Sequence, residues 1–543
     1  MAGDRRRRGP PDRLTAGGRC PAALTLGALA LALAGCPASR PAAGPPGLGR
    51  RVFSGPARGL SASADGAWLA FLTECREARG EVLPPRTASC DLEVAPSAGG
   101  PPRRVAEAVT TLPQGLLWSP EGDTLAVLAG FDYPSASGTL VLVRGGGGPQ
   151  RVADGVTFHG FVPGEPAGVA AVAGGRLLFA RAGGSPEWFP GAEGLGSFEV
   201  NPAWSARREG ETGTLLRRSG PAGGALLAVA AKDGKVRELA PRTGDYRFSP
   251  SGSAFAYTVQ GPTGFELRLA AGGRTRTMGR EVTGFAFARD GGALAFVAGA
   301  RPGLQGDLYL APVEGGEARL LAREVGEYRW AAHAPRLAWL ERYDPRVRSG
   351  TAGAQGSDGK PRTFASNVSD LELAPDGRHL AFLQHTTRGG YSVDLGLADL
   401  DGPPGQPPAT VAQGVFGFAF SPDGRWLYYR TRCTRNAEAC DLERVPAGGL
   451  APGTKPEAVV QAAKSFEFDP RDPGRLLVTW QRADRDALDL AVWEAGRLTR
   501  VDTYALPGSA RFLGPDSRRL AYAVIQEKRA GVYVADLGEA GAP

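Results

Sequence analysis

One stretch decides the fold: Phe418-Ala-Phe-Ser-Pro-Asp-Gly-Arg-Trp-Leu-Tyr-Tyr429. Apolar residues alternate with Ala419 in its first part, which is the period of a β-strand. Pro422 cannot donate a ladder hydrogen bond and ends that strand. The pair Asp423-Gly424 is a hairpin signal, because Asp bonds its own backbone and Gly adopts positive φ easily. The aromatic run that follows predicts a second strand. A single hairpin is marginal in water, so this one needs neighbours of the same kind.

The chain repeats this pattern along most of its length. The step from Asp376 to Asp423 is 47 residues and the step from Ser251 to Asp290 is 39 residues. Close copies are centred on Asp65-Gly66, Glu121-Gly122, Ser251-Gly252, Asp290-Gly291 and Asp376-Gly377, and weaker ones span 158–172, 198–229, 328–339, 466–480 and 512–522. About eleven units of roughly 45 residues match the period of a four-stranded propeller blade. The sequence therefore predicts an all-β protein, a β-propeller of four-stranded blades.

Each clear unit continues with a third and a fourth strand, as in Asp307–Pro312 and then Glu317–Ala322. The repeated Phe-Ser-Pro-Asp-Gly…Leu-Ala-Phe pattern resembles the TolB-type propeller repeat from about residue 51 onward. This resemblance implies a propeller fold and a role in the bacterial cell envelope through a peptidoglycan-associated partner. Propellers host many activities, so the pattern predicts fold far better than function.

The two ends of the repeat region are complementary. Arg50-Arg-Val-Phe53 looks like a fourth strand without its first three, and Gly531–Asp536 looks like a third strand without its fourth. We therefore expect the two to pair and to close the propeller, which removes an exposed edge. Single rings usually have four to eight blades. About eleven units favour two tandem rings, with one propeller region over 51–282 and a second over 283–543.

The N-terminal segment predicts export. Residues 1–35 combine six Arg with a short apolar run and end in Leu33-Ala-Gly-Cys36, which resembles a bacterial lipobox. On this reading Cys36 carries the lipid, and residues 36–50 form a flexible, Pro-rich tether. A plain signal peptide is the alternative. Because Pro37 is not the Asp of an inner-membrane retention signal, we expect an envelope protein on the periplasmic side of the outer membrane.

Four of the six cysteines form two pairs with the same surroundings. Cys75 and Cys90 bracket the connection between the second and third strands of one unit, and Cys433 and Cys440 do so in another. Those strands are antiparallel neighbours, so the sulfurs should meet, and an exported chain folds in an oxidising compartment. We predict two disulfides, Cys75–Cys90 and Cys433–Cys440. A four-Cys metal site would need closer spacing.

The search for chemistry yields no catalytic, cofactor-binding or metal-binding residue. The net charge of +7 falls to about +3 without the signal, and the basic residues are scattered, so nucleic acid is not an expected partner. There are four His; His379 stands where Trp426 stands in the next unit and reads as a packing position. Two long connections, 74–90 and 343–360, are the places where binding residues would be sought first.

Two functions of different classes remain open. The first is a non-catalytic, membrane-anchored scaffold whose propeller binds an envelope protein or polymer. The alternative is a propeller enzyme that acts on a saccharide or peptide in the central channel. A tight group of acids or histidines beside a pocket in the channel would favour the enzyme.

Overall fold

The computed structural model describes residues 48–77, 88–120, 122–165, 167–189, 193–203, 212–218, 224–230, 235–299, 305–386, 392–434, 439–448, 454–481 and 487–538. The predicted signal segment 1–35 lies outside these residues. So do Cys36 and the rest of the predicted tether up to residue 47. The compact unit is Pro46–Pro543. In its described part, no helix is long and apolar enough to cross a bilayer.

The described strands group into eleven blades, each built of four antiparallel strands. Blade 1 consists of β2 (Arg58–Ala62), β3 (Trp68–Glu77), β4 (Ala88–Pro96) and β5 (Arg103–Thr110), and blade 2 of β6 (Leu116–Trp118), β7 (Thr124–Asp132), β8 (Ser137–Arg144) and the first half of β9 (Gln150–Phe161). Blade 3 consists of the second half of β9, β10 (Gly168–Ala173), β11 (Arg176–Arg181) and β12 (Glu187–Trp188), and blade 4 of β13 (Leu195–Val200), β14 (Thr212–Arg218), β15 (Leu226–Ala230) and β16 (Val236–Ala240). Blade 5 consists of β17 (Thr243–Phe248), β18 (Ala254–Gln260), β19 (Phe265–Ala271) and β20 (Arg274–Gly279).

Blades 6 to 11 follow the same order. Blade 6 consists of β21 (Gly284–Phe287), β22 (Ala293–Ala298), β23 (Gly306–Pro312) and β24 (Arg319–Val325), and blade 7 of β25 (Glu327–Trp330), β26 (Leu337–Asp344), β27 (Ser349–Gln355) and the first half of β28 (Pro361–Leu373). Blade 8 consists of the second half of β28, β29 (His379–Thr386), β30 (Ser392–Asp399) and β31 (Ala409–Ala412), and blade 9 of β32 (Gly417–Phe420), β33 (Trp426–Thr431), β34 (Cys440–Pro446) and β35 (Glu457–Ala463). Blade 10 consists of β36 (Ser465–Phe468), β37 (Arg475–Gln481), β38 (Leu488–Glu494) and β39 (Arg497–Ala505), and blade 11 of β40 (Arg511–Leu513), β41 (Arg519–Val524), β42 (Gly531–Asp536) and β1 (Arg50–Ser54). Two short 3₁₀ turns are described, η1 (Pro113–Gly115) and η3 (Glu527–Arg529).

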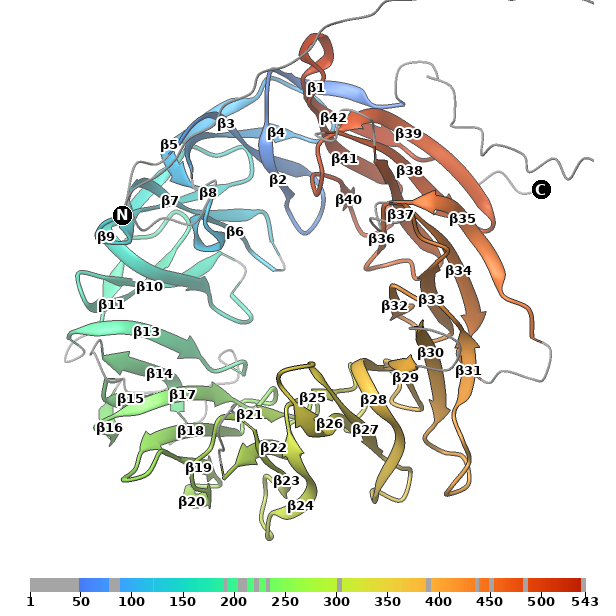
Figure 1. Ribbon diagram of the computed structural model, residues 1–543. Helices are drawn as coiled ribbons and strands as arrows, with labels where there is room; N and C mark the ends of the chain where they lie inside the picture. The colour runs from blue at the N-terminus through green and yellow to red at the C-terminus, as the bar shows by residue number, and fades with distance from the viewer. Residues whose placement is uncertain are drawn as a thin grey trace, which may run out of the picture. The chain divides into compact units, whose positions relative to one another are not determined.

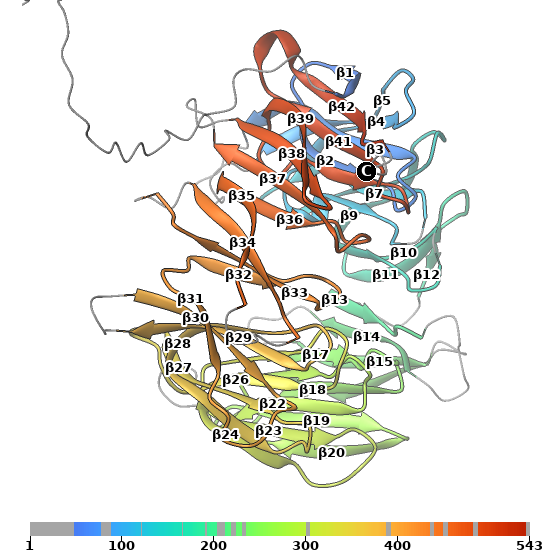
Figure 2. The same cartoon turned by 90° about the vertical axis from the view of Figure 1, so that its right-hand side faces the viewer.

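The hydrophobic core is divided among the junctions between neighbouring blades. A separate buried cluster joins every blade to the next one along the chain, and another joins blade 11 back to blade 1 through Leu513 and Val532 against Leu60 and Phe71. The described blades therefore form one ring (Figure 1), and Figure 2 shows from the side that its blue and red ends lie together.

The prediction of two tandem rings is wrong. Two rings would leave blades 5 and 6 without a shared core, and blade 5 would turn back to pack on blade 1. Instead Ala256 and Leu269 of blade 5 pack with Leu294 and Phe296 of blade 6 in one cluster. This cluster lies across the boundary expected after residue 282. The physical reason is that every blade buries apolar side chains on both faces, so the junction between blades 5 and 6 resembles the others.

The first strand closes the ring, as the sequence predicts. β1 pairs antiparallel with β42, with Arg50 opposite Val534 and Ser54 opposite Gly531. The first described strand of the chain thus serves as the outer strand of the last blade. Val52 and Val534 are both buried in the cluster between blades 11 and 1. Pairing of strands so far apart in the chain holds the described ring shut.

The Asp-Gly hairpins have the predicted turn chemistry. In blade 9 the Asp423 carboxylate accepts hydrogen bonds from the Ser421 hydroxyl at 2.6 Å and from the Arg425 N–H at 3.1 Å. Gly424 adopts φ of 71°, in the left-handed region that glycine enters without steric cost. The carboxylate is occupied within the turn, which agrees with a structural rather than a chemical role for these Asp residues.

One expectation about loops is wrong. The connection 343–360 contains β27, the third strand of blade 7. Its sequence, Ser-Gly-Thr-Ala-Gly-Ala-Gln, has no large apolar residue and so does not show as a strand. The fully buried Trp339 of the neighbouring strand fills the space instead, and a Cβ on Gly353 would lie 2.4 Å from its indole nitrogen. Small residues here accommodate a large side chain on the paired strand.

Up-and-down strand order gives the ring two different ends. The turns between first and second strands, and between third and fourth, lie at one end, which we call the turn face. The connections between second and third strands, and those between successive blades, lie at the other end, which we call the loop face. First strands such as β2, β32 and β36 lie on the inner side of the ring (Figure 1).

Candidate functional site

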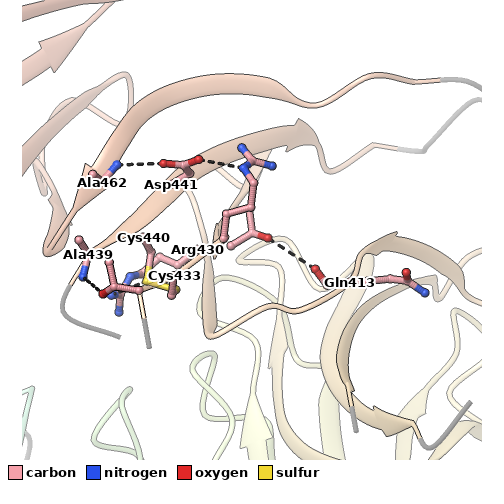
Figure 3. The surroundings of a disulfide bond; sticks show 10 residues. Gln413, Arg430, Cys433, Ala439, Cys440, Asp441 and Ala462 are labelled. Carbon is pink, nitrogen blue, oxygen red and sulfur yellow. Dashed lines mark hydrogen bonds and ion pairs between the residues drawn. A yellow bond between two sulfur atoms is a disulfide. The ribbon is translucent and has the colours of Figure 1, made fainter. Parts of the chain in front are cut away.

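Both predicted disulfides are present, and both lie at the loop face. Cys75 joins Cys90 in blade 1, and Cys433 joins Cys440 in blade 9. The second bridge is shown in Figure 3, together with Asp441, whose carboxylate accepts the N–H of Ala462 at 2.9 Å. Each bridge ties the second strand of its blade to the third at the end where the connection leaves the sheet.

An acidic pair begins next to the second cysteine of each bridge, and one arginine contacts both acids of each pair. In blade 1, Arg104 lies 2.9 Å from Asp91 and 3.4 Å from Glu93. In blade 9, Arg432 lies 2.8 Å from Asp441 and 2.5 Å from Glu443. Arg104 lies on the fourth strand of its blade and Arg432 in the connection after the second, so a different part of the blade supplies the cation for the repeated Asp-Leu-Glu sequence in each case. These partners explain the acids as structural.

The inner wall carries two carboxylates at equivalent positions, three residues before a proline. Glu199 on β13 accepts a hydrogen bond from the Phe248 N–H of blade 5 at 3.1 Å. Glu372 on β28 accepts one from the N–H of Phe420 in blade 9. Each bond joins the first strands of adjacent blades. Burial raises the pKa of Glu372 to about 7 and also raises the pKa of Glu199, outweighing the hydrogen bond in each case.

Glu372 has charged neighbours on the same wall. Arg329 Nη2 lies 2.6 Å from Glu327 Oε1 and 3.3 Å from Asp370 Oδ1. Burial raises the pKa of Asp370, against the attraction of Arg329. A carboxyl that titrates near neutral pH can give and take protons. None of the three clefts described below is lined by Glu372, Arg329, Glu327 or Asp370, however. The four residues therefore have the position of a structural contact between adjacent blades.

His159 is the most isolated titratable group of the described residues. It lies on β9, is only 5% exposed, and neither ring nitrogen has a hydrogen-bond partner. Burial lowers its pKa to about 4. The equivalent position in other first strands holds Phe198, Phe285 or Phe418, so a histidine here occupies an aromatic packing site. His379 opens β29 as Trp426 opens β33, in agreement with the packing role expected for it.

The largest of the three clefts lies at the loop face, where the ring closes. Its volume is about 1160 Å³, and we call it the seam cleft. Three connections form it: the one from β1 to β2, the one from β39 to β40, and the hairpin from β41 to β42. Its lining consists of Arg51, Ser54, Gly55, Pro56, Ala57, Arg58, Ala88, Leu506, Pro507, Ile525, Glu527, Lys528 and Ala530. Smaller clefts of about 370 and 40 Å³ lie between blades 10 and 11 around Glu467 and Ala510.

A buried ion pair holds the hairpin that carries Lys528. The Asp502 carboxylate is 1% exposed and receives Arg529 Nη2 at 2.6 and 2.8 Å. The Tyr522 hydroxyl donates to the same carboxylate at 2.8 Å, and the Tyr533 hydroxyl donates to the Arg529 carbonyl at 2.7 Å. Burial and the Asp502 charge raise the pKa of Tyr522 well above its usual range, so this hydroxyl stays a donor. With Arg529 turned inward, η3 directs its other charges outward.

Backbone bonds fix the rest of the cleft. The Gly55 N–H donates to the Ala530 carbonyl at 2.9 Å, and the Leu506 N–H donates to the Ala523 carbonyl at 2.8 Å. A Cβ on Gly531 would lie 2.2 Å from the Phe53 carbonyl oxygen and 3.1 Å from Arg51 Cδ, so only glycine lets the Arg51 stem lie across this backbone. The cleft is built before any ligand arrives.

The sequence indicates neither the seam cleft nor the Asp502–Arg529 pair. Its parts come from both ends of the described chain, and only the ring closure brings them together. The one available signal is Asp502, a charged residue in a strand between the buried residues Val501 and Ala505. Among the described residues, no group of three or more His, Cys, Asp or Glu could hold a metal ion.

Comparison with known proteins finds distant structural similarity only. No protein-family model matches the chain, and no curated protein does. A crystal structure of the eukaryotic initiation factor is similar over 70% of this chain and 97% of that chain, with 12% identity and a TM-score of 0.40. Tricorn protease is similar over 89% of this chain and 57% of its own, with 11% identity and a TM-score of 0.30. The β-propeller domain of the Trilobed protease from Pyrococcus furiosus is similar over 56% of this chain and 94% of its own, with 13% identity and a TM-score of 0.27. At such identities the likeness concerns the fold alone.

Proposed function

We propose that the protein is a non-catalytic binding scaffold of the bacterial cell envelope, anchored by a lipid on Cys36 and TolB-like in its role. The observation that carries the proposal is the seam cleft, a preformed and open surface at the loop face of a closed ring. Stiff rings that present loops at one end are suited to binding. An envelope protein or a peptidoglycan-associated partner on the periplasmic side of the outer membrane is the expected ligand.

A short length of chain joins the proposed anchor to the first described residues. The Leu48 N–H donates to the Val501 carbonyl at 2.9 Å, so the described chain begins against blade 10, next to the seam. Leu48 comes twelve positions after Cys36. A chain of that length spans at most about 40 Å. A lipid on Cys36 would therefore keep the seam within that distance of the bilayer surface, where an envelope partner could reach it.

Site-specific photocrosslinking in the native envelope tests the scaffold. A photoreactive residue at Pro507 or Lys528 reports on the loop face, and the same residue at Arg378 or Arg425 reports on the turn face. We expect one discrete protein adduct from the loop face only. Equal adducts from both faces, or none from either, would contradict a loop-face scaffold. Fatty-acid labelling tests the anchor separately: label should be lost in Cys36→Ser.

One observation favours the alternative of a propeller enzyme that acts on a saccharide or peptide. Glu372 and Asp370 lie on the inner wall, and burial raises the pKa of both. If the wall is an active site, incubation with glycan and peptide libraries should yield products, and Glu372→Gln should stop turnover without lowering the amount of folded protein. Turnover that survives Glu372→Gln would exclude this acid from the reaction.

A further inference from the structure

We propose that the seam cleft binds an extended, acidic peptide segment of a partner protein, with acidic side chains on either side of an apolar one. This inference rests on the proposed scaffold function and names the chemistry of its ligand. Four features carry it: unpaired cations in the lining, apolar residues beside them, the size of the cleft, and a hairpin that is held in place by an ion pair.

The cations of the cleft are free, unlike most arginines with structural roles in the ring. Arg51, Arg58 and Lys528 are all exposed, and none of them makes an ion pair or a side-chain hydrogen bond within the described residues. By contrast, Arg104 and Arg432 each contact several carboxylates. The single acid of the lining, Glu527, leaves an excess of two positive charges. Such an excess complements an acidic ligand.

Part of the cleft lining is apolar. Pro56, Ala57, Leu506, Pro507 and Ile525 contribute it. An apolar side chain that lies between acidic ones would cover these residues while its neighbours reach the cations. No lining residue is aromatic, so the lining offers no stacking platform of the kind that binds a sugar ring. A peptide fits the combination of charge and apolar surface better than a polysaccharide does.

The size of the cleft points to a chain rather than a small molecule. Small-molecule pockets usually measure 300–1,000 Å³ and are closed around the ligand. The seam cleft, at about 1160 Å³, exceeds that range and is open along three connections. Its lining comes from the connection before blade 1, from Ala88 of blade 1, from the connection between blades 10 and 11, and from the hairpin of blade 11. An extended segment can occupy this surface without any rearrangement of the ring.

The cleft does not need to order itself when the ligand binds. The Arg529 Nη2 group contacts both carboxylate oxygens of Asp502 and fixes η3, and Gly531 gives the Arg51 stem a surface to lie on. Preorganisation of this kind raises affinity by lowering the entropy cost of association. Glu527 adds selectivity, because it repels an acid placed beside Lys528 and accepts a basic residue there.

The test uses an octapeptide display library panned on the full chain in detergent. The first variant reverses three charges of the cleft, Arg51→Glu, Arg58→Glu and Lys528→Glu. The matched control reverses three exposed arginines far from the cleft, which also lack partners within the described residues: Arg237→Glu, Arg274→Glu and Arg497→Glu. Both variants change the net charge equally. Circular dichroism and unfolding curves then show whether each variant keeps the fold.

We expect the unchanged protein to enrich peptides with an excess of Asp and Glu around an apolar residue. Synthetic copies should bind at least about tenfold more weakly to the cleft variant and as before to the control, with affinity that falls as salt rises from 50 to 500 mM. Enrichment of neutral or basic peptides, or acidic peptides that bind both variants equally, would overturn the proposal. No enrichment at all would overturn it too.

In each of these cases a loop-face crosslink in the envelope would leave the scaffold function standing, with its binding surface elsewhere. Equal binding of anionic lipid vesicles by the unchanged protein and the control, lost only in the cleft variant without peptide enrichment, would assign the cleft to lipid headgroups and overturn the peptide.

Discussion

Replacement of Asp502 by alanine should destabilise blade 11, where the ring closes. Its carboxylate is 1% exposed and accepts from Arg529, from the Tyr522 hydroxyl and from the Thr503 N–H. Breaking a buried ion pair costs about 3–5 kcal/mol when the remaining charge is fully buried. The Arg529 side chain is 25% exposed and can regain some water, which lowers that cost. The Tyr522 hydroxyl, in a fully buried residue, loses its acceptor and adds about 1–3 kcal/mol.

Together these terms predict a loss of about 3–5 kcal/mol for Asp502→Ala, with the loss concentrated at the seam. Hydrogen exchange read by mass spectrometry measures this locally, because eleven blades need not unfold in one step. Protection of β41, β42 and β1 should fall by a factor of about 10² to 4 × 10³, at 1.4 kcal/mol per factor of ten. Peptides from blade 5, on the far side of the ring in chain order, should keep their protection.

A double-mutant cycle with Arg529→Ala separates the pair from the rest of the site. Arg529→Ala alone leaves a buried carboxylate without its cation and should cost as much as Asp502→Ala. The double variant should cost clearly less than the sum, with a coupling of about 2–3 kcal/mol. A loss below 1 kcal/mol for Asp502→Ala, or a loss spread evenly over all blades, would refute the idea that this pair holds the seam.

Three further predictions concern single side chains. Burial raises the pKa of Glu372 from 4.5 to about 7, so the stability that this residue contributes below pH 4.5 should be lost as the pH rises through 7, by up to about 3 kcal/mol. Denaturant unfolding at pH 4 and pH 8 should show that Glu372→Gln abolishes this loss. The same pH profile in the variant and the unchanged protein would refute the burial of a charge there. Burial lowers the pKa of His159 from 6.5 to about 4, so the free energy of unfolding should fall as the pH drops from 6.5 to 4. The variant His159→Phe, which introduces the residue found in the equivalent strands, should remove this fall and raise the unfolding midpoint at pH 5. A lower midpoint would show that the imidazole has a hydrogen-bond partner. Arg430 Nη2 lies 3.0 Å from Cys440 Sγ and should stabilise the thiolate of the reduced pair, so Arg430→Leu should shift the glutathione-equilibrated potential of Cys433–Cys440 to more negative values by about 30 mV, while the bridge in blade 1 serves as an internal control.

The fold could be predicted from the sequence because its signals are local and repeated. The Asp423-Gly424 turn, the alternation around it and the spacing of its copies lie within single units, and the number of units was right. The partnership of β1 with β42 was also predictable, since each end lacked what the other supplied. The number of rings was not, because it depends on how strongly blade 5 packs on blade 6, and junction packing leaves no distinct local pattern.

The sites divide in the same way. Both disulfides follow from spacing and from the antiparallel strands that carry them. β27 escaped prediction because its small residues are explained only by Trp339 on the next strand. The seam cleft escaped because Arg58 and Lys528 are 470 positions apart in the sequence and meet only after closure. Local patterns predict what one unit can do alone, whereas sites assembled from distant units require the ring itself.

The pairing of β1 with β42 also imposes an order of events on synthesis. Ser54 and Gly531 are separated by 477 positions, so the first strand is made long before its partner exists. At about 5–20 residues per second, this wait lasts roughly 25 to 95 s. During that time the earlier blades can form, but β1 has no partner strand, and the face of blade 1 that packs on blade 11 stays uncovered. The described ring can therefore close only after β42 has been made, and truncated products that lack Gly531–Asp536 are left with an open edge that quality-control proteases can recognise.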